Sequence, residues 1–520
     1  MMITSHNRIH ALRDNLALLG SIQRGVEKEG LRVDPHGNLA RTGHPISLGS
    51  ALTNSHITTD YAEALLELIT APHPSVEALM TELHDIHSFT AQAIGDEIIW
   101  NQSMPAHLPA EADIQIGWYG TSNSGMLKHI YRRGLAERYG KYMQCIAGVH
   151  YNFSVPDDLW PLLAIGGRDA NEQRSEGYLA LIRNFTRYSW LLMYLFGASP
   201  AVSSSFLNDQ ALPLERIAED TYALPWATSL RMSDLGYQNK EAQAELQLCY
   251  NDLDTLLMRM CHAATTPWPD YEKIGTHRDG EWIQLNNNIL QIENEYYSNI
   301  RPKRTTLEGE RPATALKSRG VEYVEVRCLD IDPYSPIGIS AETCRFLDTF
   351  LLFCAVEHSA FFPDNGFCQD SKRNFAKVVT EGRKPGLILR NPNKKDVSLQ
   401  EWGADILEAI QPYAKLFDEY HQHSLHSEAL ALQKKKLANP DLTPSGRLLN
   451  ELTSSGACFN RFSLTQSKAS TEQLKAYPLG ADQFERYTQA AADSIAAQAA
   501  LEAEDEQSFD EFLKHFEALL

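Results

Sequence analysis

The sequence predicts an α+β protein, because it combines a few strand segments that have one polar face with many helical segments. Residues 148–155 alternate polar and apolar side chains, and residues 321–329 are rich in β-branched and aromatic types. Residues 26–33 carry acidic side chains at alternate positions. Between and after these segments, apolar residues recur at the spacing of amphipathic helices.

The segment Gly-Val-Glu-Lys-Glu-Gly-Leu-Arg-Val at residues 25–33 is the most informative strand. Alternate residues of a strand point to the same face, so Glu27 and Glu29 stand roughly 7 Å apart on one side. Two desolvated carboxylates at that separation repel each other unless a divalent metal or an arginine neutralises them. An exposed edge strand with solvated charges fits this segment equally well.

Residues 57–70 form an apolar stretch that Asp60, Glu63 and Glu67 interrupt. Glu63 and Glu67 have the spacing of neighbours on one helix face, whereas the β-branched end and the turn at 71–74 suit a strand in the second half. Taken alone, the pattern favours a helix with a solvated acidic face.

The strand at 148–155 carries His150, Asn152 and Ser154 on one face and apolar residues on the other. A lone histidine is usually a satisfied structural residue. This one belongs to a polar row whose opposite side packs into a core, so we favour a ligand role for it.

The strand at 321–329 places Glu325 and Arg327 on one face, so a carboxylate and a guanidinium again stand together. A basic cluster, Arg301-Pro-Lys-Arg304, precedes this strand. A bare basic cluster is more often a solvated turn, and the adjoining QIENE block at 291–295 makes an anion-binding site about equally good.

Helical segments fill most of the remaining chain. Ser75 is the expected N-cap of one of them, and the alanine-rich, acidic tail after residue 471 is also helical in spacing. We expect the C-terminal third to pack against the rest and support it. The other segments predicted as helices are 7–19, 75–98, 178–196 (ended by 197–200), 340–357 and 399–438.

Three histidines cluster in the segment His421-Gln-His-Ser-Leu-His426. Their spacing does not form a clean helical pair, and Glu428 is the only acidic residue that follows at metal-ligand spacing. The pattern therefore favours a solvated helix surface over a metal site.

Composition limits the classes of partner and compartment. The formal net charge of -20 argues against nucleic acid or anionic membrane as a partner, although it does not exclude ATP. Eight cysteines without a Cys-x-x-Cys pair fit a reducing compartment, and the first 24 residues lack the features of a signal peptide. The longest apolar run, 189–202, is too short to span a bilayer, so we expect a cytoplasmic protein.

The common nucleotide-binding loops are absent from the sequence. The segment 120–125 has the first glycine spacing of a P-loop, but Met126 stands where that loop needs lysine. A phosphate site would then have to be built from metal ions and side chains. Six acidic or imidazole side chains offer the oxygen-rich ligation that magnesium prefers: Glu27, Glu29, Asp60, Glu67, His150 and Glu325.

Seven sequence blocks occur together in the order and spacing of one known family. They are GVEKEGLRV at 25–33, TTDYAEALLELIT at 58–70, YGTSNSG at 119–125, GVHYNFS at 148–154, SLRMSDLGY at 229–237, QIENEYYSNIRPKR at 291–304 and EYVEVRCLDIDPYSPIG at 322–338. The chain from about residue 20 to about residue 390 closely resembles the bacterial glutamate-cysteine ligases, or γ-glutamylcysteine synthetases.

The resemblance implies a glutamine synthetase-like fold, in which a curved antiparallel sheet forms a funnel surrounded by helices. It implies that the six residues named above hold two or three Mg²⁺ ions, or Mn²⁺, around the ATP phosphates, and that Arg327 faces the transferred phosphoryl group. The implied reaction phosphorylates the γ-carboxylate of L-glutamate, after which the amine of L-cysteine displaces phosphate from γ-glutamyl phosphate. This is the first step of glutathione biosynthesis, and inhibition by glutathione is expected with it.

The resemblance also implies roles for further residues. Asn152, Ser154, Arg301 and Arg304 are expected near ATP and its phosphates, and Arg132 near a glutamate carboxylate. Position 61 is usually phenylalanine in the family, so the hydroxyl of Tyr61 departs from the pattern. The residues expected around the substrate amino acids are Tyr61, Tyr131, Arg132, Gln144, Arg231, Tyr237 and Tyr297.

Because the candidate site residues run from Glu27 to Arg327, we expect one catalytic domain at 1–395 and a mainly helical extension at 396–520 packed on it. No obligatory protein partner is expected. Three alternatives stay open: a γ-glutamyl ligase that uses ammonia or another amine, a metal-dependent phosphohydrolase, and a non-catalytic metal or glutamate sensor. The phosphoryl-facing arginine argues against the sensor.

Overall fold

A seven-stranded sheet lies at the centre of the computed structural model, which describes residues 5–207, 214–236, 241–244, 246, 248–307, 309–363 and 369–520. Six strands follow the order β11-β12-β5-β1-β3-β2, β4 pairs with β1, and every pairing is antiparallel. The strands are β1 (Gln23–Val33), β2 (Ile57–Thr59), β3 (Leu65–Ile69), β4 (Ile98–Ile99), β5 (Val149–Ser154), β11 (Ile300–Lys303) and β12 (Tyr323–Leu329).

Helices and small hairpins surround this sheet. The helices are α1 (Ser5–Arg13), α2 (Val76–Ala93), α3 (Asn123–Tyr139), α4 (Leu159–Leu162), α5 (Ala170–Phe196), α6 (Ser204–Leu207), α7 (Glu241–Ala244), α8 (Leu253–Thr265), α9 (Pro269–Ile274), α10 (Pro312–Arg319), α11 (Ala341–Val356), α12 (Gln369–Glu381), α13 (Leu399–His421), α14 (Leu425–Ala438), α15 (Pro444–Ser455), α16 (Phe459–Ala476), α17 (Ala481–Glu504) and α18 (Phe509–Glu517). The minor strands are β6 (Ala201–Ser203), β7 (Glu215–Ala218), β8 (Thr221–Ala223), β9 (His277–Arg278), β10 (Glu281–Trp282), β13 (Ile388–Arg390) and β14 (Asp396–Ser398).

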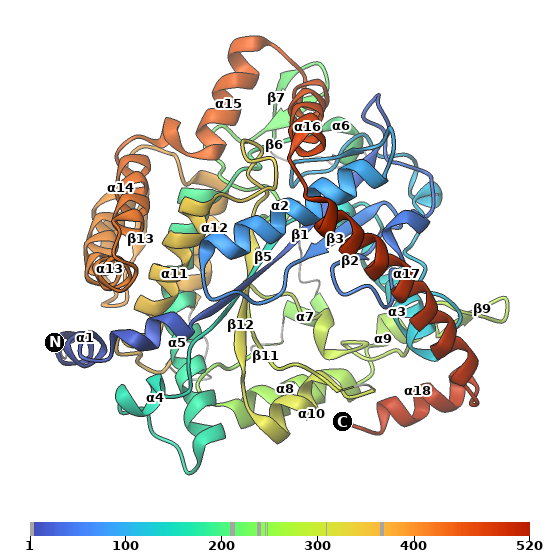
Figure 1. Cartoon of the computed structure of the whole chain (residues 1–520), viewed down its shortest axis with the longest axis horizontal. Helices are drawn as coiled ribbons and strands as arrows, with labels where there is room; N and C mark the ends of the chain where they lie inside the picture. Colours follow the sequence, from blue (N-terminus) through green and yellow to red (C-terminus); the bar gives the residue numbers. More distant parts are fainter. Residues whose placement is uncertain are drawn as a thin grey trace.

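The alternation of side chains gives the sheet one apolar face. Val26 of β1, Tyr151 and Phe153 of β5, and Val324 and Val326 of β12 are fully buried in the main hydrophobic core. Helix α2 packs on β1 and β3, α5 packs on β11 and β12, and α11 packs on both helices. Figure 1 shows α2 crossing in front of the sheet. Burial of this face fixes the register, because a slip of one residue would turn the polar set into the core.

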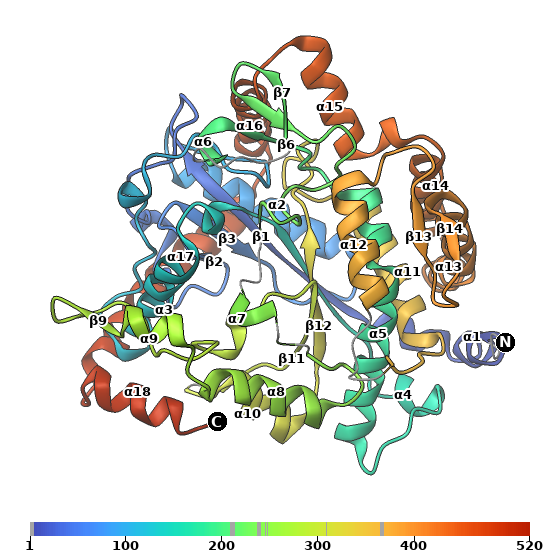
Figure 2. The same cartoon turned by 180° about the vertical axis from the view of Figure 1, so that it is seen from behind.

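The opposite face of the sheet is turned toward α3, α7, α8 and α9, which Figure 2 shows on the near side of the molecule. The C-terminal helices α16 to α18 pack on helices that cover the sheet. α16 and α17 contact α2, and α18 contacts α3 (Figure 1). The predicted α+β class, with an antiparallel sheet and a mainly helical C-terminal part, is confirmed, whereas the boundary between residues 395 and 396 stays a prediction.

One predicted helix is wrong. Residues 57–70 form β2 and β3 instead of a helix with a solvated acidic face. The long strand β1 offers its edge to β3, with Glu29 opposite Glu67, and this tertiary pairing overrides the local helical spacing. Glu63 lies in the turn between the strands, where its carboxylate accepts hydrogen bonds from the backbone N–H groups of His44 and Trp118 at 2.9 and 2.8 Å.

Most other helix predictions are confirmed with changed ends. The hydroxyl of Ser75 caps α2, which stops at Ala93. The helix expected at 7–19 ends at Arg13 and continues as a separate 3₁₀ turn at Leu16–Ser21, because Asp14 and Asn15 interrupt it. The segments 178–196, 340–357, 399–438 and the tail are helical as expected.

The apolar run at 189–202 forms the buried end of α5 and the start of β6. Within the described ranges, no helix is both long enough and apolar enough to cross a bilayer.

Candidate functional site

The register of the central strands brings distant polar residues together on the inner face of the sheet. Glu27 of β1 stands directly opposite His150 of β5. Glu325 of β12 stands between two partners, Asn152 on one side and Arg301 on the other. Side chains paired across antiparallel strands have Cβ atoms about 5 Å apart, so the pairing alone builds a continuous polar patch.

His150 lies at the centre of this patch. Its Nδ1 atom is 3.2 Å from Oε2 of Glu27 and 3.9 Å from Oε1 of Glu325, and its Nε2 atom is 3.6 Å from Oε1 of Glu29. Two groups have ligand atoms within 4.8 Å of one another: Glu27, His150 and Glu325, and Glu29, Glu67 and His150. The two sets share one imidazole, so two cation positions would lie side by side.

The carboxylates have different electrostatic environments. Burial, and then the neighbouring carboxylates, raises the pKa of Glu67 well above its ordinary value. Burial also raises the pKa of Glu29. The pKa of Glu325 lies well below its ordinary value, because Lys303 and Arg327 outweigh the effect of its burial. The Glu29–Glu67 side of the patch therefore has an excess of negative charge that a bound cation would relieve.

Two buried oxygens in the patch indicate that a divalent cation fits the site. Oε2 of Glu325 and Oδ1 of Asn152 accept no hydrogen bond from any described residue. The amide Nδ2 of Asn152 donates to Oε1 of Glu27 at 2.8 Å, which orients the carboxylate. Carboxylate-rich ligation of this kind suits Mg²⁺ or Mn²⁺, and buried oxygens without partners are costly unless a ligand satisfies them.

The patch forms one wall of a cavity of about 500 Å³. Most of the residues predicted from the sequence line this cavity, and helix α3 supplies the wall opposite the strands. The predicted residues at its surface are Glu27, Glu29, Asp60, Tyr61, Glu67, Tyr131, Arg132, Gln144, His150, Tyr297, Arg301, Glu325 and Arg327.

Other predicted residues lie elsewhere. Ser154 is at the end of β5 and does not line the cavity, and Tyr237 lies outside the described residues. Arg304 follows β11, and its guanidinium donates to the backbone oxygens of Gly320 and Arg319 at 2.8 and 2.7 Å. Arg304 lines a second, adjoining cavity, and its role near phosphate stays a prediction.

Arg231 lies behind the cavity wall instead of at its surface. It is 1% exposed, and its guanidinium is 3.7 Å from Oδ1 of Asp330. It donates a hydrogen bond of 2.9 Å to the backbone oxygen of Arg327. This arrangement gives Arg231 a positioning role toward the strand that carries Arg327.

The cavity is also lined by Lys303, Lys128 and Phe516, which were not predicted as site residues. Lys303 stands two residues after Arg301, so strand alternation would have placed both on the same face. Its Nζ atom is 3.4 Å from Oε1 of Glu325. Lys128 lies one helical turn before Arg132, which is the spacing of a shared helix face. No sequence pattern predicted that Phe516 lines the cavity, because it belongs to the C-terminal helix α18, far away in the sequence.

A second cavity of about 320 Å³ adjoins the first. The two share residues Asn294, Arg301, Lys303, Thr306 and Pro312. The deeper wall of the second cavity is mostly aromatic and aliphatic, formed by Tyr250, Leu256, Met260, Tyr296, Leu316 and Tyr323. An apolar slot that opens through a basic edge into a carboxylate cluster is suited to a nucleotide.

Sequence comparison identifies similar proteins over nearly the whole chain. A family model described as glutamate-cysteine ligase matches residues 9–378. A glutamate-cysteine ligase of Bordetella petrii is 59% identical over 517 residues, which cover 99% of this chain and 98% of that protein. A glutamate-cysteine ligase of Azotobacter vinelandii is 53% identical over 510 residues, which cover 97% of this chain and 96% of that protein.

Solved structures show the same similarity. The glutamate-cysteine ligase of Francisella tularensis, solved in complex with AMP, superposes with a TM-score of 0.89 at 38% identity, covering 96% of this chain and 97% of that one. A bifunctional glutathione synthetase of Pasteurella multocida superposes with a TM-score of 0.70 at 25% identity. That match covers 98% of this chain and 58% of the longer protein.

Proposed function

Because this chain belongs to the glutamate-cysteine ligase family, we propose that it joins the γ-carboxylate of L-glutamate to the amine of L-cysteine with cleavage of ATP to ADP and phosphate. The product is γ-glutamylcysteine, which places the enzyme at the first step of glutathione biosynthesis. The observation that carries this proposal is the polar face of the sheet, where five carboxylates, one imidazole and the guanidinium groups of Arg301 and Arg327 meet in a single cavity.

ATP fits across the two adjoining cavities. The aromatic slot around Tyr250, Tyr296 and Tyr323 suits the adenine ring, and the triphosphate would pass Arg301 and Lys303 toward the carboxylates. AMP in the Francisella relative supports an adenine nucleotide as the ligand of this fold. Lys303, which alternates with Arg301 along β11, is a better phosphate contact than Arg304.

The cation sites would be formed by Glu27, His150 and Glu325 on one side and by Glu29, Glu67 and His150 on the other. Asp60 lines the same cavity and would complete the set. When bound, Mg²⁺ supplies charge neutralisation at the phosphate oxygens. The protein's own contribution is to hold these carboxylates on rigid paired strands, so that no reorganisation is needed during the reaction.

Phosphoryl transfer comes first. The γ-carboxylate oxygen of glutamate attacks the γ-phosphorus of ATP, the bond to the bridging oxygen breaks, and ADP leaves with that electron pair. Arg327 donates N–H groups to the equatorial oxygens, where negative charge accumulates. Its ion pair with Glu325, 3.2 Å between Nη1 and Oε1, holds it at the edge of the carboxylate cluster.

Amide formation follows. The cysteine amine attacks the acyl carbon of γ-glutamyl phosphate, phosphate leaves with the electron pair of the C–O bond, and the amine proton passes to a nearby oxygen base. The cavity wall formed by Tyr61, Tyr131, Gln144 and Tyr297 is suited to the two amino acids, and Arg132 to a glutamate carboxylate. Ammonia as the acceptor remains the second candidate.

Two further expectations belong to this proposal. Every cysteine in the described ranges has a free thiol, which supports a reducing, cytoplasmic setting. Inhibition by glutathione follows from its shared γ-glutamylcysteine portion, which would compete for the same cavity.

The proposal is tested by measuring ADP release with magnesium-ATP and L-glutamate in three parallel reactions: no acceptor, ammonia and L-cysteine. Mass spectrometry would identify the product. We expect ADP release to require L-cysteine and to match γ-glutamylcysteine mole for mole. Release that depends on ammonia would support the second candidate, and release without any amino acid would indicate a phosphohydrolase.

A further inference from the structure

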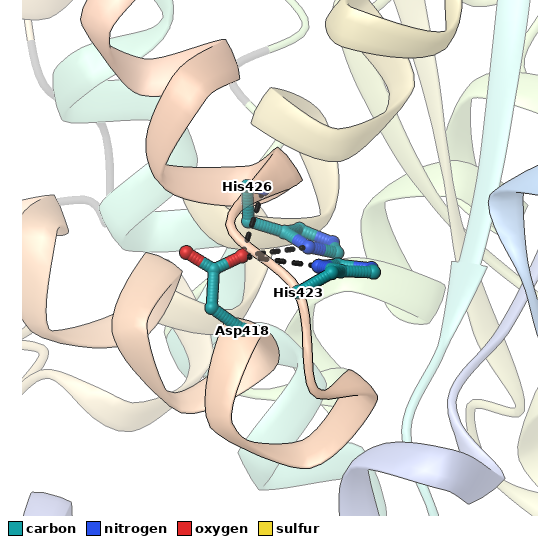
Figure 3. Close-up of side chains that lie close together, drawn as sticks. All are labelled: Asp418, His423 and His426. Carbon is teal, nitrogen blue, oxygen red and sulfur yellow. Dashed lines mark hydrogen bonds and ion pairs between the residues drawn. The ribbon is translucent and has the colours of Figure 1, made fainter.

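A second potential metal site lies outside the cavity, at the turn between α13 and α14. Asp418, His423 and His426 meet there, and the three side chains are drawn in Figure 3. Their segment was expected to be a solvated helix surface, and that expectation is wrong. Helix α13 ends at His421, Gln422 adopts the left-handed conformation with φ 57°, and the returning chain buries His426 to 3% exposure.

The geometry of the three ligand atoms suits a tetrahedral ion. Oδ1 of Asp418 is 3.4 Å from Nδ1 of His423 and 3.6 Å from Nδ1 of His426, and one ligand atom from each of the three residues lies within 4.8 Å of the others. Nδ1 of His423 also accepts a hydrogen bond of 3.3 Å from the backbone N–H of Leu425, which an ion bound at this atom would displace. Zinc-to-nitrogen bonds of about 2.0–2.1 Å in tetrahedral geometry require ligand atoms roughly 3.4 Å apart. Figure 3 shows both imidazole rings turned toward the same carboxylate oxygen.

Helix capping explains only part of this arrangement. Asp418 accepts hydrogen bonds from the backbone N–H groups of His426 and Ser427, at 2.9 and 3.1 Å, and so caps the start of α14. It does not explain His426, whose Nε2 atom is buried without a hydrogen bond to any part of the chain that the structure describes and whose Nδ1 atom has a long ion-pair contact of 3.6 Å with Oδ1 of Asp418. Burial of an imidazole with such weak contacts is costly, and a metal ion between Nδ1 and the carboxylate would replace the long contact with two short bonds.

The imidazole rings are held in place by stacking. The ring of His426 lies 4.6 Å from that of Phe417 with an interplanar angle of 9°, and the His423 ring lies 5.5 Å from His426. His421 stacks beside both histidines at 5.2 and 5.8 Å. The C-terminal end of α13 also favours a nearby cation through its unpaired carbonyl groups. Such fixed ligands lose little entropy when they bind an ion.

We propose that Asp418, His423 and His426 bind a zinc-class divalent ion that clips the end of α13 to the start of α14, with the fourth position open to solvent. Imidazole ligands select Zn²⁺, Co²⁺, Ni²⁺ or Cu²⁺, whereas the carboxylate-rich sheet selects Mg²⁺ or Mn²⁺. The two sites should therefore be separable by the ion used. This site is independent of the reaction proposed for the sheet.

The test is a titration of the chelator-treated full chain with Co²⁺ in millimolar Mg²⁺, followed by the visible absorption of tetrahedral cobalt. We expect one equivalent of Co²⁺ to bind, Zn²⁺ to displace it, and Zn²⁺ to raise Tm. Asp418→Asn and His423→Ala should each weaken binding at least tenfold. His423 is half-buried at the turn, so its removal spares the core, and the Tm of the metal-free variant verifies folding.

Two control variants separate this site from other histidines. The exposed surface variant His36→Ala and the sheet variant His150→Asn should both retain the cobalt signal at full stoichiometry. Full binding by His423→Ala and Asp418→Asn, loss of the signal in His150→Asn, or no cobalt binding by the parent protein would each overturn the proposal.

Discussion

Three contacts, one of the side chain and two of the backbone, hold Arg327 in place. Its guanidinium pairs with Glu325, its backbone N–H donates to the oxygen of Asn299 at 2.8 Å, and its own backbone oxygen accepts from Arg231. The carboxyl of Asp330 in turn accepts from the hydroxyls of two buried serines. The guanidinium is thus held at the cavity surface before any ligand arrives, which is the condition for electrostatic stabilisation of a transition state.

Replacing Arg327 with alanine should lower kcat by about 10²–10³, because a preorganised donor to the transferred group is lost. Lysine at this position should recover only part of the loss, because it offers a point charge instead of a planar fork. Steady-state kinetics with thermal unfolding as a folding control would measure both effects. Turnover within threefold of the parent in Arg327→Ala would remove this residue from the mechanism.

Tyr61 carries a buried hydroxyl that lines the cavity but has no hydrogen-bond partner among the residues described. Burial raises its pKa, so the hydroxyl stays protonated as a donor. If it donates to the acceptor amino acid, Tyr61→Phe should raise KM for L-cysteine about three- to tenfold, the equivalent of one neutral hydrogen bond, with little change in kcat. An unchanged KM would show that the hydroxyl does not contact the acceptor.

At the scale of residues, strand alternation predicted which side chains of β1, β5 and β12 share one face, because alternation depends only on backbone geometry. The position of Arg231 could not be predicted, because a buried arginine that supports another residue has the same sequence signature as one that touches substrate. The choice of Lys303 over Arg304 as a phosphate contact required knowing that β11 ends at Lys303, because strand alternation no longer places the side chain of Arg304.

At the scale of helices and strands, the local sequence pattern failed to predict β2 and β3. β3 is a short strand that pairs with β1, more than 30 residues away in the sequence, and β2 in turn pairs with β3. No property of residues 57–70 alone reports that partner. Helices α5, α11 and α13 were predictable because each has its own long apolar stripe.

Helix α2 contains a titratable residue that should make stability depend on pH. His87 is fully buried, and burial together with the charge of Lys28 lowers its pKa well below the ordinary value. The unfolded chain takes up a proton below pH ~6.5 that the folded chain excludes, so stability falls as the pH drops from 7 toward the folded pKa.

His87→Leu should remove this dependence. Between pH 7 and pH 5, the parent protein should lose up to about 2 kcal/mol more unfolding free energy than the variant. Urea unfolding at the two pH values measures the difference, and the solvent-exposed His36→Leu provides the matched control. Equal losses in His87→Leu and the parent would contradict the account.

At the scale of the whole molecule, the C-terminal helices complete the site. Backbone N–H of Thr121 donates to Oε1 of Glu502 in α17 at 2.8 Å, so the glycine-rich turn before α3 serves docking of this helix. In α18, the ring of Phe516 lies 4.5 Å from the guanidinium of Arg311 and faces the cavity. The expectation that the C-terminal third only supports the fold is therefore too narrow.

Deletion of residues 507–520 should leave the sheet folded but open the cavity wall to water. We expect kcat/KM for L-glutamate to fall on the order of tenfold or more, because solvent weakens the electrostatic contacts inside the site. Phe516→Ala should cause a smaller loss in the same direction, and His515→Ala, on the exposed side of α18, little change. Full activity of the deleted protein would contradict a role for α18 in the wall.

The match to the Francisella enzyme confirms the fold that the sequence blocks implied for residues from about 20 to about 390. The contribution of α18 could not be predicted, because its sequence has only the pattern of an amphipathic helix and its partner surface arises from distant segments. Contacts between segments hundreds of residues apart depend on tertiary packing, which no local pattern encodes.

The central claim is that the inner face of the sheet transfers a phosphoryl group to the γ-carboxylate. The most direct test supplies L-glutamate labelled with ¹⁸O in both γ-carboxylate oxygens, together with magnesium-ATP and L-cysteine, and analyses the released phosphate by mass spectrometry. An acyl phosphate intermediate predicts one ¹⁸O in each phosphate and one in the amide of the product. Phosphate without ¹⁸O would contradict the account.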